Sequence, residues 1–284
     1  MGRTAIVTDS TGDVPPHVAD ALGISVLPIT VRFGDQEFRD GIDITPPEFF
    51  RRLREADELP STSQPSAGEF GEVYRELSRS ADSIVSIHIS EELSGTLASA
   101  HAAKAQLDLP IPVHIIDTRS VSMGHGLLVL AAAQLAKKGI DAPEIVERIQ
   151  ALIPKTSILF VVNTLDYLHA GGRIGGAERL LGSILNIKPI LHVAEGKIDA
   201  LAKARTKGKA VARMLDIMSD RVGRAPAVHA AIIQADATEE AARLKEKIET
   251  AFPCSELHTC DLCPSLSVHT GPGTVAVAFY AGDA

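Results

Sequence analysis

The sequence predicts an α/β protein, and two observations carry that prediction. Short runs of apolar, often β-branched residues alternate along the chain with longer amphipathic segments rich in Ala and Leu, as strands alternate with helices in α/β folds. Hydrophobic residues make up 45% of the 284 residues and charged residues 23%, which is enough apolar material for a substantial core. Strand–helix–strand order favours largely parallel sheets joined by right-handed crossovers.

The individual elements follow from these runs, taken in order. Strands are expected over residues 5–8, 24–33, 83–89, 113–117, 158–163, 190–193, 227–234, 256–261 and 274–280. Helices are expected over residues 46–56, 67–78, 96–107, 122–138, 142–152, 207–221 and 238–251. Thr45 stands before Pro46 and Pro47, an N-cap residue followed by Pro at the first helical position. Capping-box spacing is found in Ser66 with Glu69 and in Asp141 with Glu144.

The chain divides into two α/β domains, expected over residues 1–155 and 156–284. A strand–helix series runs to about residue 155, where Pro154 closes it, and a Gly-rich segment follows at 171–176. Residues 193–198 then have the pattern of a β-hairpin, whose short turn makes an antiparallel pair. We therefore expect a mostly parallel, Rossmann-like sheet in the N-terminal domain and a mixed sheet in the C-terminal domain.

Composition and charge argue against several classes of function. Lys and Arg number 28 against 36 Asp and Glu, a net charge of −8, which disfavours a nucleic-acid binder and a polybasic membrane anchor. The longest apolar stretch, residues 127–133, falls far short of a spanning helix, and the first residues carry no signal-peptide core. Three cysteines are an odd number in a long chain, so a reducing cytoplasm is expected. Aromatic residues are only 4%, without Trp, so any apolar site must be mostly aliphatic.

The familiar motifs of nucleotide and nucleophile chemistry are missing from the sequence. Gly208-Lys209 lacks the flanking residues of a phosphate-binding P-loop. Neither a G-x-S-x-G elbow nor an H-E-x-x-H motif occurs. The Gly-rich segment at 171–176 departs from G-x-G-x-x-G spacing and is interpreted as a loop between elements.

A zinc site is the one metal centre that composition allows. Its donors would be Cys254, His258, Cys260 and Cys263, a Cys₃His set. His258 and Cys260 alternate along the strand expected over 256–261 and would share one face, a position more typical of buried thiols in a sheet. We expect neither a metal nor a cofactor.

Hydroxyl-rich segments stand at the ends of several expected strands. They are residues 8–12, 61–66, 90–96, 117–120 and 269–273. In open parallel sheets ligands bind beyond the carboxyl ends of the strands, and helix N-termini after such segments favour anions. Neutral hydroxyls and amides with one histidine, His269, suit a carboxylate better than a polyphosphate, which usually recruits Lys, Arg or Mg²⁺. The alternative, that these residues are only caps and turn formers and His269 a structural histidine, stays open.

Six short motifs, in this order, resemble the DegV family. They are Thr-Asp-Ser-Thr at 8–11, Ser-Thr-Ser-Gln-Pro-Ser at 61–66, Ser-Gly-Thr at 94–96, Asp-Thr-Arg-Ser at 117–120, Gly-Gly-Arg-Ile at 171–174 and His-Thr-Gly-Pro-Gly at 269–273. The resemblance extends over essentially the whole chain. It implies a two-domain α/β protein that buries one long-chain fatty acid between its domains, as the fatty-acid-binding subunit of bacterial fatty acid kinase.

The resemblance also assigns roles to individual residues. Thr62 and Ser94 would hold the fatty-acid carboxylate through their hydroxyl groups. The residues beside that carboxylate would be His269 and Thr270. The residues that would shape the pocket are Ser10, Ser63, Gly95, Thr96 and Gly271.

On this interpretation the chain is a lipid-binding carrier, and the kinase chemistry belongs to a partner. A separate ATP-binding subunit would phosphorylate the bound carboxyl group to an acyl phosphate. Arg173, in the Gly-rich segment, and Arg205 would be surface contacts for that partner, whereas an ordinary solvated arginine is the alternative. The acyl group would then pass to phospholipid synthesis, which allows transient contact with a membrane surface.

A stand-alone enzyme acting on a small phosphorylated or hydroxylated substrate is the main alternative. The same hydroxyl groups would hold a phosphate or a sugar, with Asp9 or Asp117 as base or metal ligand. Asp9 has no second aspartate two residues further on, which disfavours a dehalogenase-type phosphatase. No Mg²⁺–ATP motif supports a kinase of the dihydroxyacetone type.

Overall fold

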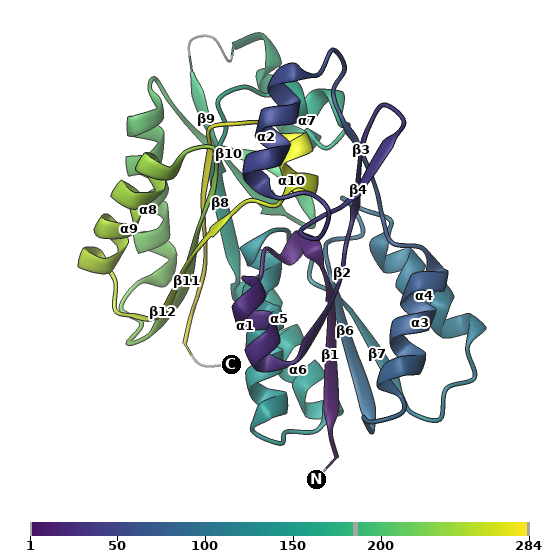
Figure 1. The fold of residues 1–284 in the computed structure, drawn as a ribbon. Coiled ribbons are helices and arrows are strands. Elements are labelled where there is room, and N and C mark those ends of the chain that lie inside the picture. Colours follow the sequence, from purple (N-terminus) through teal and green to yellow (C-terminus); the bar gives the residue numbers. More distant parts are fainter. Residues whose placement is uncertain (1, 184–186, 283–284) are drawn as a thin grey trace.

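In the computed structural model, which describes residues 2–183 and 187–282, two main sheets flank a layer of helices (Figure 1). The first sheet is parallel throughout and has the order β2-β1-β6-β7. Its strands are β1 (Thr4–Asp9), β2 (Ile24–Leu27), β6 (Ser83–His88) and β7 (Val113–Asp117). The N-terminal lobe, defined here as the chain up to residue 155, also contains α1 (Pro16–Leu22), α3 (Ala67–Leu77), α4 (Thr96–Gln106), α5 (Met123–Lys137) and α6 (Ala142–Leu152).

The second sheet is mixed and has the order β10-β9-β8-β13-β11-β12. Its strands are β8 (Ser157–Val161), β9 (Lys188–Ala194), β10 (Lys197–Ala204), β11 (Val228–Ala235), β12 (Cys254–Asp261) and β13 (Thr274–Ala281). β11 and β12 run parallel, and the other described pairs are antiparallel. The C-terminal lobe, from residue 156 onward, also contains α7 (Asp166–Ala170), α8 (Lys207–Val222), α9 (Thr238–Ala251) and α10 (Pro264–Thr270). The predicted α/β class, with one parallel and one mixed sheet, is confirmed.

A small third sheet extends from the N-terminal lobe toward the C-terminal lobe. It has the order β4-β3-β5 and is antiparallel. Its strands are β3 (Thr30–Phe33), β4 (Gln36–Arg39) and β5 (Ser61–Ser63), with α2 (Pro46–Glu55) between β4 and β5. β3 and β5 contact α10 of the C-terminal lobe (Figure 1). The small sheet therefore brings N-terminal residues onto a C-terminal helix.

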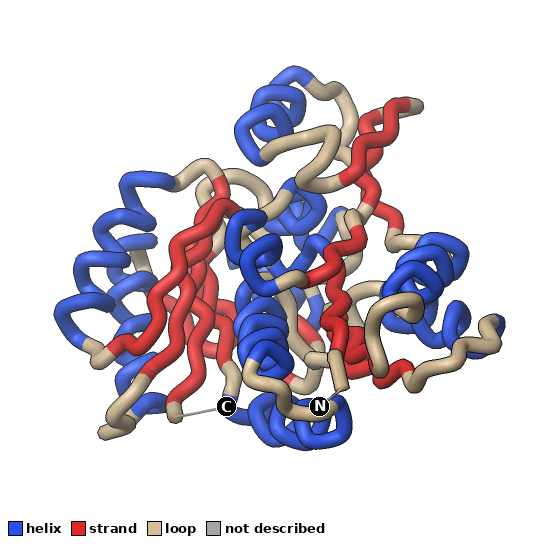
Figure 2. The backbone as a smooth tube through the Cα atoms, turned by 60° about the horizontal axis from the view of Figure 1, so that its bottom comes forward, coloured by secondary structure: helices blue, strands red, loops and turns tan. Residues whose placement is uncertain are grey.

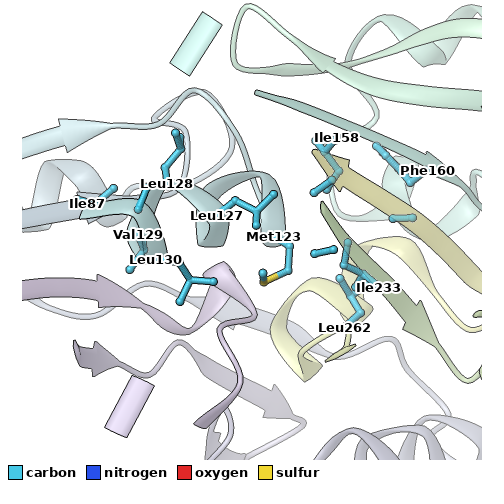
Figure 3. Close-up of a cluster of buried hydrophobic side chains, with 14 of the residues drawn as sticks. Ile87, Met123, Leu127, Leu128, Val129, Leu130, Ile158, Phe160, Ile233 and Leu262 are labelled. Carbon is cyan, nitrogen blue, oxygen red and sulfur yellow. The ribbon is translucent and has the colours of Figure 1, made fainter. Parts of the chain in front are cut away.

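Helix α5 lies at the centre of the packing. It contacts β1 and β6 of the first sheet and β8, β11 and β13 of the second, and Figure 2 shows the helical layer between the two sheets. Twelve of its 15 residues are buried, as a helix that is apolar all round requires. Leu127 and Met123 face Ile158 and Phe160 of the C-terminal lobe (Figure 3). One hydrophobic cluster consequently unites both lobes, while separate clusters lie under α3 and α4 and under α8 and α9.

At Gly126, in the first turns of α5, there is no room for a side chain. A Cβ on Gly126 would lie 2.1 Å from the carbonyl oxygen of Gly12, so glycine is required for this close approach. Gly12 ends the 3₁₀ helix η1 (Ser10–Gly12), which follows β1 directly. The contact therefore holds the segment after β1 against α5. The remaining 3₁₀ helices are η2 (Ile153–Lys155) and η3 (Gly175–Ser183).

A buried polar chain joins the ends of β1 and β6. His88 Nδ1 lies 2.8 Å from Asp9 Oδ2, and His88 Nε2 lies 2.7 Å from Ser86 Oγ. Ser86 Oγ is in turn 2.8 Å from the Tyr74 hydroxyl. Burial by itself would raise the pKa of Asp9, but the hydrogen bond with His88 and attraction to His125 bring that pKa down to about 2. Asp9 is therefore an ionised structural carboxylate.

The predicted elements agree with the structure to within two residues, with one exception. The single strand expected over 24–33 is wrong, because it is two strands, β2 and β3, in different sheets. Pro28 lies between them and has no N–H for a ladder. The hairpin expected at 193–198 is confirmed by the pairing of Lys197 with Ala194. Short elements such as α1, α7, α10, β4 and β5 were not predicted, since three to seven residues give too little periodicity. The domain boundary at residue 155 stays a prediction, although sheet membership changes between β7 and β8.

The three predicted caps stand at the N-caps of α2, α3 and α6, but only Ser66 and Glu69 form a complete capping box. Asp141 accepts a hydrogen bond of 3.0 Å from the N–H of Glu144. Thr45 lies at the N-cap of α2, but its side chain makes no capping hydrogen bond. Pro46 and Pro47 lack two of the free N–H groups of the first turn, and Pro47 stands at N2, one of the two positions from which a cap side chain accepts.

Replacing Ser66 by Ala should lower the free energy of unfolding by about 1 kcal/mol, because the N-terminal N–H groups of α3 lose their acceptor. Urea denaturation followed by circular dichroism measures this change. Ser80→Ala, in the exposed turn after the same helix, should stay within about 0.5 kcal/mol of wild type. Equal stability of the two variants would contradict the capping role.

Candidate functional site

A cavity lies between the two lobes, and its empty space, including the part open to solvent, is about 830 Å³. Its walls are largely aliphatic and come from both lobes. The apolar residues that line it are Ile29, Ile89, Leu93, Val121, Ile158, Phe160, Leu168, Ile198, Leu262, Leu266 and Ala276. Most of these belong to the central cluster around α5 or pack against it. A hydrocarbon in this cavity would extend the protein core.

Polar side chains from both lobes form part of the cavity lining. Thr62 Oγ1 of β5 lies 3.2 Å from His269 Nε2 of α10, so the two lobes meet in this hydrogen bond. Gln64, Ser94 and Thr270 line the cavity with them. The Oγ1 atom of Thr270 and the Nδ1 atom of His269 are buried and have no hydrogen-bond partner among the described residues. The Nδ1 atom lies against Gly171, where a Cβ would come within 2.2 Å of it, so Thr270 Oγ1 is the better candidate to bond a polar ligand group.

Electrostatics keep His269 neutral. Burial, and secondarily the positive charge of Arg173, lower the pKa of His269 to about 4. Near neutral pH its imidazole therefore has one donor nitrogen and one acceptor nitrogen. His269 can share a proton with Thr62 through Nε2, but it does not supply a positive charge.

Arg173 lies at the cavity and holds the loops around it. Its Nε donates to the carbonyl oxygen of Leu93 at 3.2 Å, and its NH1 donates to that of Gly171 at 2.7 Å. Arg173 carries the one formal charge among the described residues that line the cavity. The resemblance gave Arg173 only a partner-docking role, so its place beside His269 is a finding of the structure.

The turn into α4 presents Ser94 to the cavity. Ser94 Oγ accepts from the N–H of Thr96 at 3.3 Å and lies 2.9 Å from Thr96 Oγ1. A Cβ on Gly95 would come within 2.7 Å of the Gln64 amide nitrogen. Gly95 and Thr96 thus shape the site indirectly: Thr96 hydrogen-bonds to Ser94, and Gly95 leaves room for Gln64.

Helix α10 presents His269 and Thr270 on its last turn. Pro264 occupies its first turn, and Gly271 ends it with a φ of +70°. A Cβ on Gly271 would lie 2.3 Å from the Tyr167 ring of α7, so both conformation and space require glycine. Gly271 therefore fixes where the helix stops.

The other predicted site residues lie elsewhere. Ser63 is exposed beside Thr62, and Arg205 is exposed on the turn between β10 and α8. Ser10 bonds to Asp40 at 3.0 Å and lines a different groove between the lobes. The structure adds Gln64 to the site. The sequence could have indicated Gln64, because it lies inside the motif at 61–66, directly after the predicted site residues Thr62 and Ser63.

The cysteines form no cluster with metal-ligand character. All three are free and half-buried, and Cys263 lies beyond β12 at the N-cap of α10. Across the described ranges no group of three or more His, Cys, Asp or Glu side chains could hold a metal ion. None of the helices in those ranges combines the length and the apolarity that crossing a bilayer demands.

This arrangement suits an amphiphilic ligand with one hydrogen-bonding or anionic head. Hydroxyl groups, an amide and a neutral imidazole can satisfy the lone pairs of such a head, since a buried polar head without partners would be strongly disfavoured. The aliphatic walls would take its apolar part.

Residues 3–282 match the model of a family described as "Uncharacterised protein, DegV family". A DegV domain-containing protein of Streptomyces coelicolor is 39% identical over 277 residues, which is 97% of each chain. A DegV family protein from Thermus thermophilus, described as fatty-acid binding, aligns with a TM-score of 0.93 and 36% identity over 99% of this chain and 100% of its own. The DegV fatty acid binding protein of Bacillus subtilis aligns with a TM-score of 0.92 and 31% identity over the same shares. The chain therefore belongs to the DegV family.

Proposed function

We propose that this protein binds one long-chain fatty acid in the cavity between its lobes and presents the carboxylate to a separate ATP-dependent kinase subunit. The observation that carries this proposal is the hydrogen bond between Thr62 and His269 at a cavity that Ser94 also lines and whose apolar residues are almost all aliphatic. The fatty-acid binding described for the related proteins of Thermus thermophilus and Bacillus subtilis supports it.

Burial of the hydrocarbon tail supplies the affinity. A chain of roughly 14 methylenes at about 0.8 kcal/mol each offers on the order of 11 kcal/mol of gross transfer free energy. Loss of translational and conformational freedom removes part of it, which leaves room for submicromolar binding. Since one methylene changes the binding free energy by only about 1–3 kcal/mol, neighbouring chain lengths should compete.

The carboxylate is recognised mainly by neutral groups. Thr62 and Ser94 donate their hydroxyl protons to its oxygens, and Thr270, whose Oγ1 is otherwise unpaired, can add a third donor. His269 orients the Thr62 hydroxyl through its Nε2 atom. Arg173, at the edge of the same cavity, offsets the negative charge of the head from a partly solvated position.

The kinase subunit supplies the phosphoryl chemistry. A carboxylate oxygen attacks the γ-phosphorus of ATP, the bond between that phosphorus and the bridging oxygen breaks, and ADP leaves with the electron pair. This chain's residues hold the attacking oxygen, exclude water from the tail and offset the added charge through Arg173. Arg205, exposed away from the cavity, serves docking. The acyl group of the acyl phosphate then passes to phospholipid synthesis.

Native mass spectrometry of the purified protein should show one long-chain fatty acid bound to each chain, because the cavity walls are aliphatic and come from both lobes. Extraction and delipidation should remove this added mass. An empty protein that hydrolyses phosphate esters, or binds ATP alone, would contradict the proposal in favour of a stand-alone enzyme.

Combined replacement of Thr62 and Ser94 by Ala should weaken fatty-acid binding by about 100-fold, since two hydrogen bonds to a charged group contribute about 1.5–3 kcal/mol each and are partly replaced by water. Titration with a fluorescent fatty acid measures the affinity. Thr62→Ser, which keeps the hydroxyl, is the matched control and should bind nearly as wild type. Wild-type affinity in the double variant would remove both residues from the head site.

Arg205→Ala should leave fatty-acid affinity unchanged but reduce acyl-phosphate formation when the kinase subunit is limiting, because its side chain is exposed away from the cavity. The assay follows ADP release from purified kinase subunit with the loaded carrier. Arg224→Ala removes an equally exposed arginine near the end of α8 and should have no effect. Full activity of Arg205→Ala at every carrier concentration would exclude this docking role.

A further inference from the structure

Helix α10 separates two spaces between the lobes. Its residues Ser265 and Leu266 line the cavity described above. Cys263 and Pro264, at its start, line a second groove of about 2130 Å³ on the other side. The position of α10 therefore sets the shape of the cavity, and its last turn carries His269.

Two buried carboxylates of the N-terminal lobe hold the first turn of this helix. The N–H of Cys263 donates to Asp13 Oδ1 at 2.9 Å. The N–H of Ser265 donates to Asp40 Oδ2 at 3.4 Å, and the Ser265 hydroxyl donates to the same oxygen. Asp13 is 8% exposed and Asp40 is 2% exposed. Both acidic groups thus face the end of α10 where its N–H groups are unpaired.

The carboxylates are themselves fixed by the N-terminal lobe. The Ser122 hydroxyl, at the N-cap of α5, donates to Asp13 Oδ2. The Ser10 hydroxyl donates to Asp40 Oδ2 at 3.0 Å and accepts from the N–H of Ile29 at 3.0 Å. Asp13 itself adopts a left-handed φ of 51°, a conformation that costs free energy and persists where the surroundings impose it. The two acidic groups are therefore set in place by β1, β3 and α5.

We propose that Asp13 and Asp40 are positioning residues of the fatty-acid site, which hold α10 against the N-terminal lobe so that His269 meets Thr62. The inference rests on the proposed function for its ligand. α10 has only seven residues and spans roughly 10 Å, so it moves as one rigid rod. A displacement of its first turn is therefore passed to His269, whose Nε2 lies 3.2 Å from Thr62 Oγ1.

The same two groups make the contact sensitive to pH. Burial raises the pKa of Asp13 to about 7, with hydrogen bonds from Ser122 and Cys263 opposing and repulsion by Asp40 adding to the shift. Burial also raises the pKa of Asp40, whose Oδ1 is buried with no hydrogen-bond partner in the described ranges. The other titratable groups that line the same groove are Asp9, Asp20, Lys245, Cys260, Asp261 and Cys263. Cys260 and Cys263 interact electrostatically with Asp13, and His125 lies against Gly12, the residue before Asp13.

The direction of the pH dependence follows from the raised pKa of Asp13. The pKa of Asp13 in the packed arrangement lies above its ordinary value of 3.8. The hydrogen bonds with Cys263 oppose this shift, but burial between the lobes outweighs them. A proton on Asp13 therefore stabilises the packed arrangement fully below about pH 4. This stabilisation is lost as the pH rises to about 7, and no further loss follows above that. Affinity that depends on packed α10 should fall across the same window.

The test compares two substitutions of one residue. Asp13→Asn keeps an acceptor for the N–H of Cys263 without a titratable group, whereas Asp13→Ala removes the acceptor. Binding of cis-parinaric acid, a fluorescent fatty acid, should weaken by about tenfold in Asp13→Ala and by less than about threefold in Asp13→Asn. Asp20→Asn removes an exposed charge from the same groove and is the matched control, expected to bind as wild type.

The pH profile separates positioning from a merely structural role. The ratio of the wild-type Kd to the Asp13→Asn Kd should rise between pH 5 and 7, by at most about tenfold per pH unit, and then level off. Titration of the fatty acid itself cancels in this ratio. A flat ratio, or Asp13→Ala binding as wild type, would overturn the positioning role while leaving the fatty-acid site intact.

A second readout needs no fatty acid. The imidazole NMR signals of His269 should shift in Asp13→Ala and return to wild-type positions in Asp13→Asn, because the variants change where α10 holds this ring. Unchanged signals in Asp13→Ala would reject the inference. Wild-type protein that fails to bind any long-chain fatty acid would overturn the proposed function instead, so the two failures are distinguishable.

Discussion

The burial of α5 on all sides is the constraint on which the rest of the structure depends. A helix whose residues from Met123 to Leu130 are all buried cannot face water, so each lobe must cover one side of it. The two sheets therefore share one core and do not form two separate cores. Because the cavity lies in that shared interface, its walls are continuous with core side chains such as Val121 and Ile158. The ligand site is thus a part of the shared core in which packing between the lobes is incomplete. The outer hydrophobic clusters under α3 and α8 are separate from this core.

The same interface explains how a chain with a net charge of −8 can present a site for an anion. Long-range attraction is absent, so recognition must be local and desolvated. Thr62 comes from the small sheet of the N-terminal lobe and His269 from α10 of the C-terminal lobe, and neither lobe alone makes the hydrogen bond between them. Burial lowers the pKa of His269 to about 4, so the imidazole serves as a hydrogen-bonding group. Arg173 remains the local positive charge.

Local patterns in the sequence were enough to predict the longer elements but not how distant elements meet. Periodicity located the long helices, and the hairpin at 193–198 followed from its turn. Hydroxyl-rich segments near strand ends stood out in the sequence, and the family resemblance singled out Thr62, Ser94 and His269 within them. These three residues do line one cavity. Ser10 belonged to a similar segment but faces Asp40 across a different groove, because the side on which a strand-end residue lies depends on where α10 passes. That helix has seven residues and no clear periodic signal. The aliphatic walls could not be ranked from sequence, since their choice depends on tertiary packing around α5.

Asp9 and Asp13 lie within five residues of each other at the carboxyl end of β1, but their carboxyl groups have opposite pKa shifts. Both carboxylates are buried, and burial alone would raise both pKa values. Asp9 faces two imidazoles, His88 and His125, and its pKa falls to about 2. Asp13 faces hydroxyl and backbone donors together with a second carboxylate, Asp40, and its pKa rises to about 7. The first carboxylate is therefore a permanent charge that fixes the N-terminal lobe internally, whereas the second lies where the lobes meet and changes its charge near neutral pH. Since Asp13 is bonded to the segment that begins α10, its protonation is linked to the contact between lobes and not to the stability of either sheet.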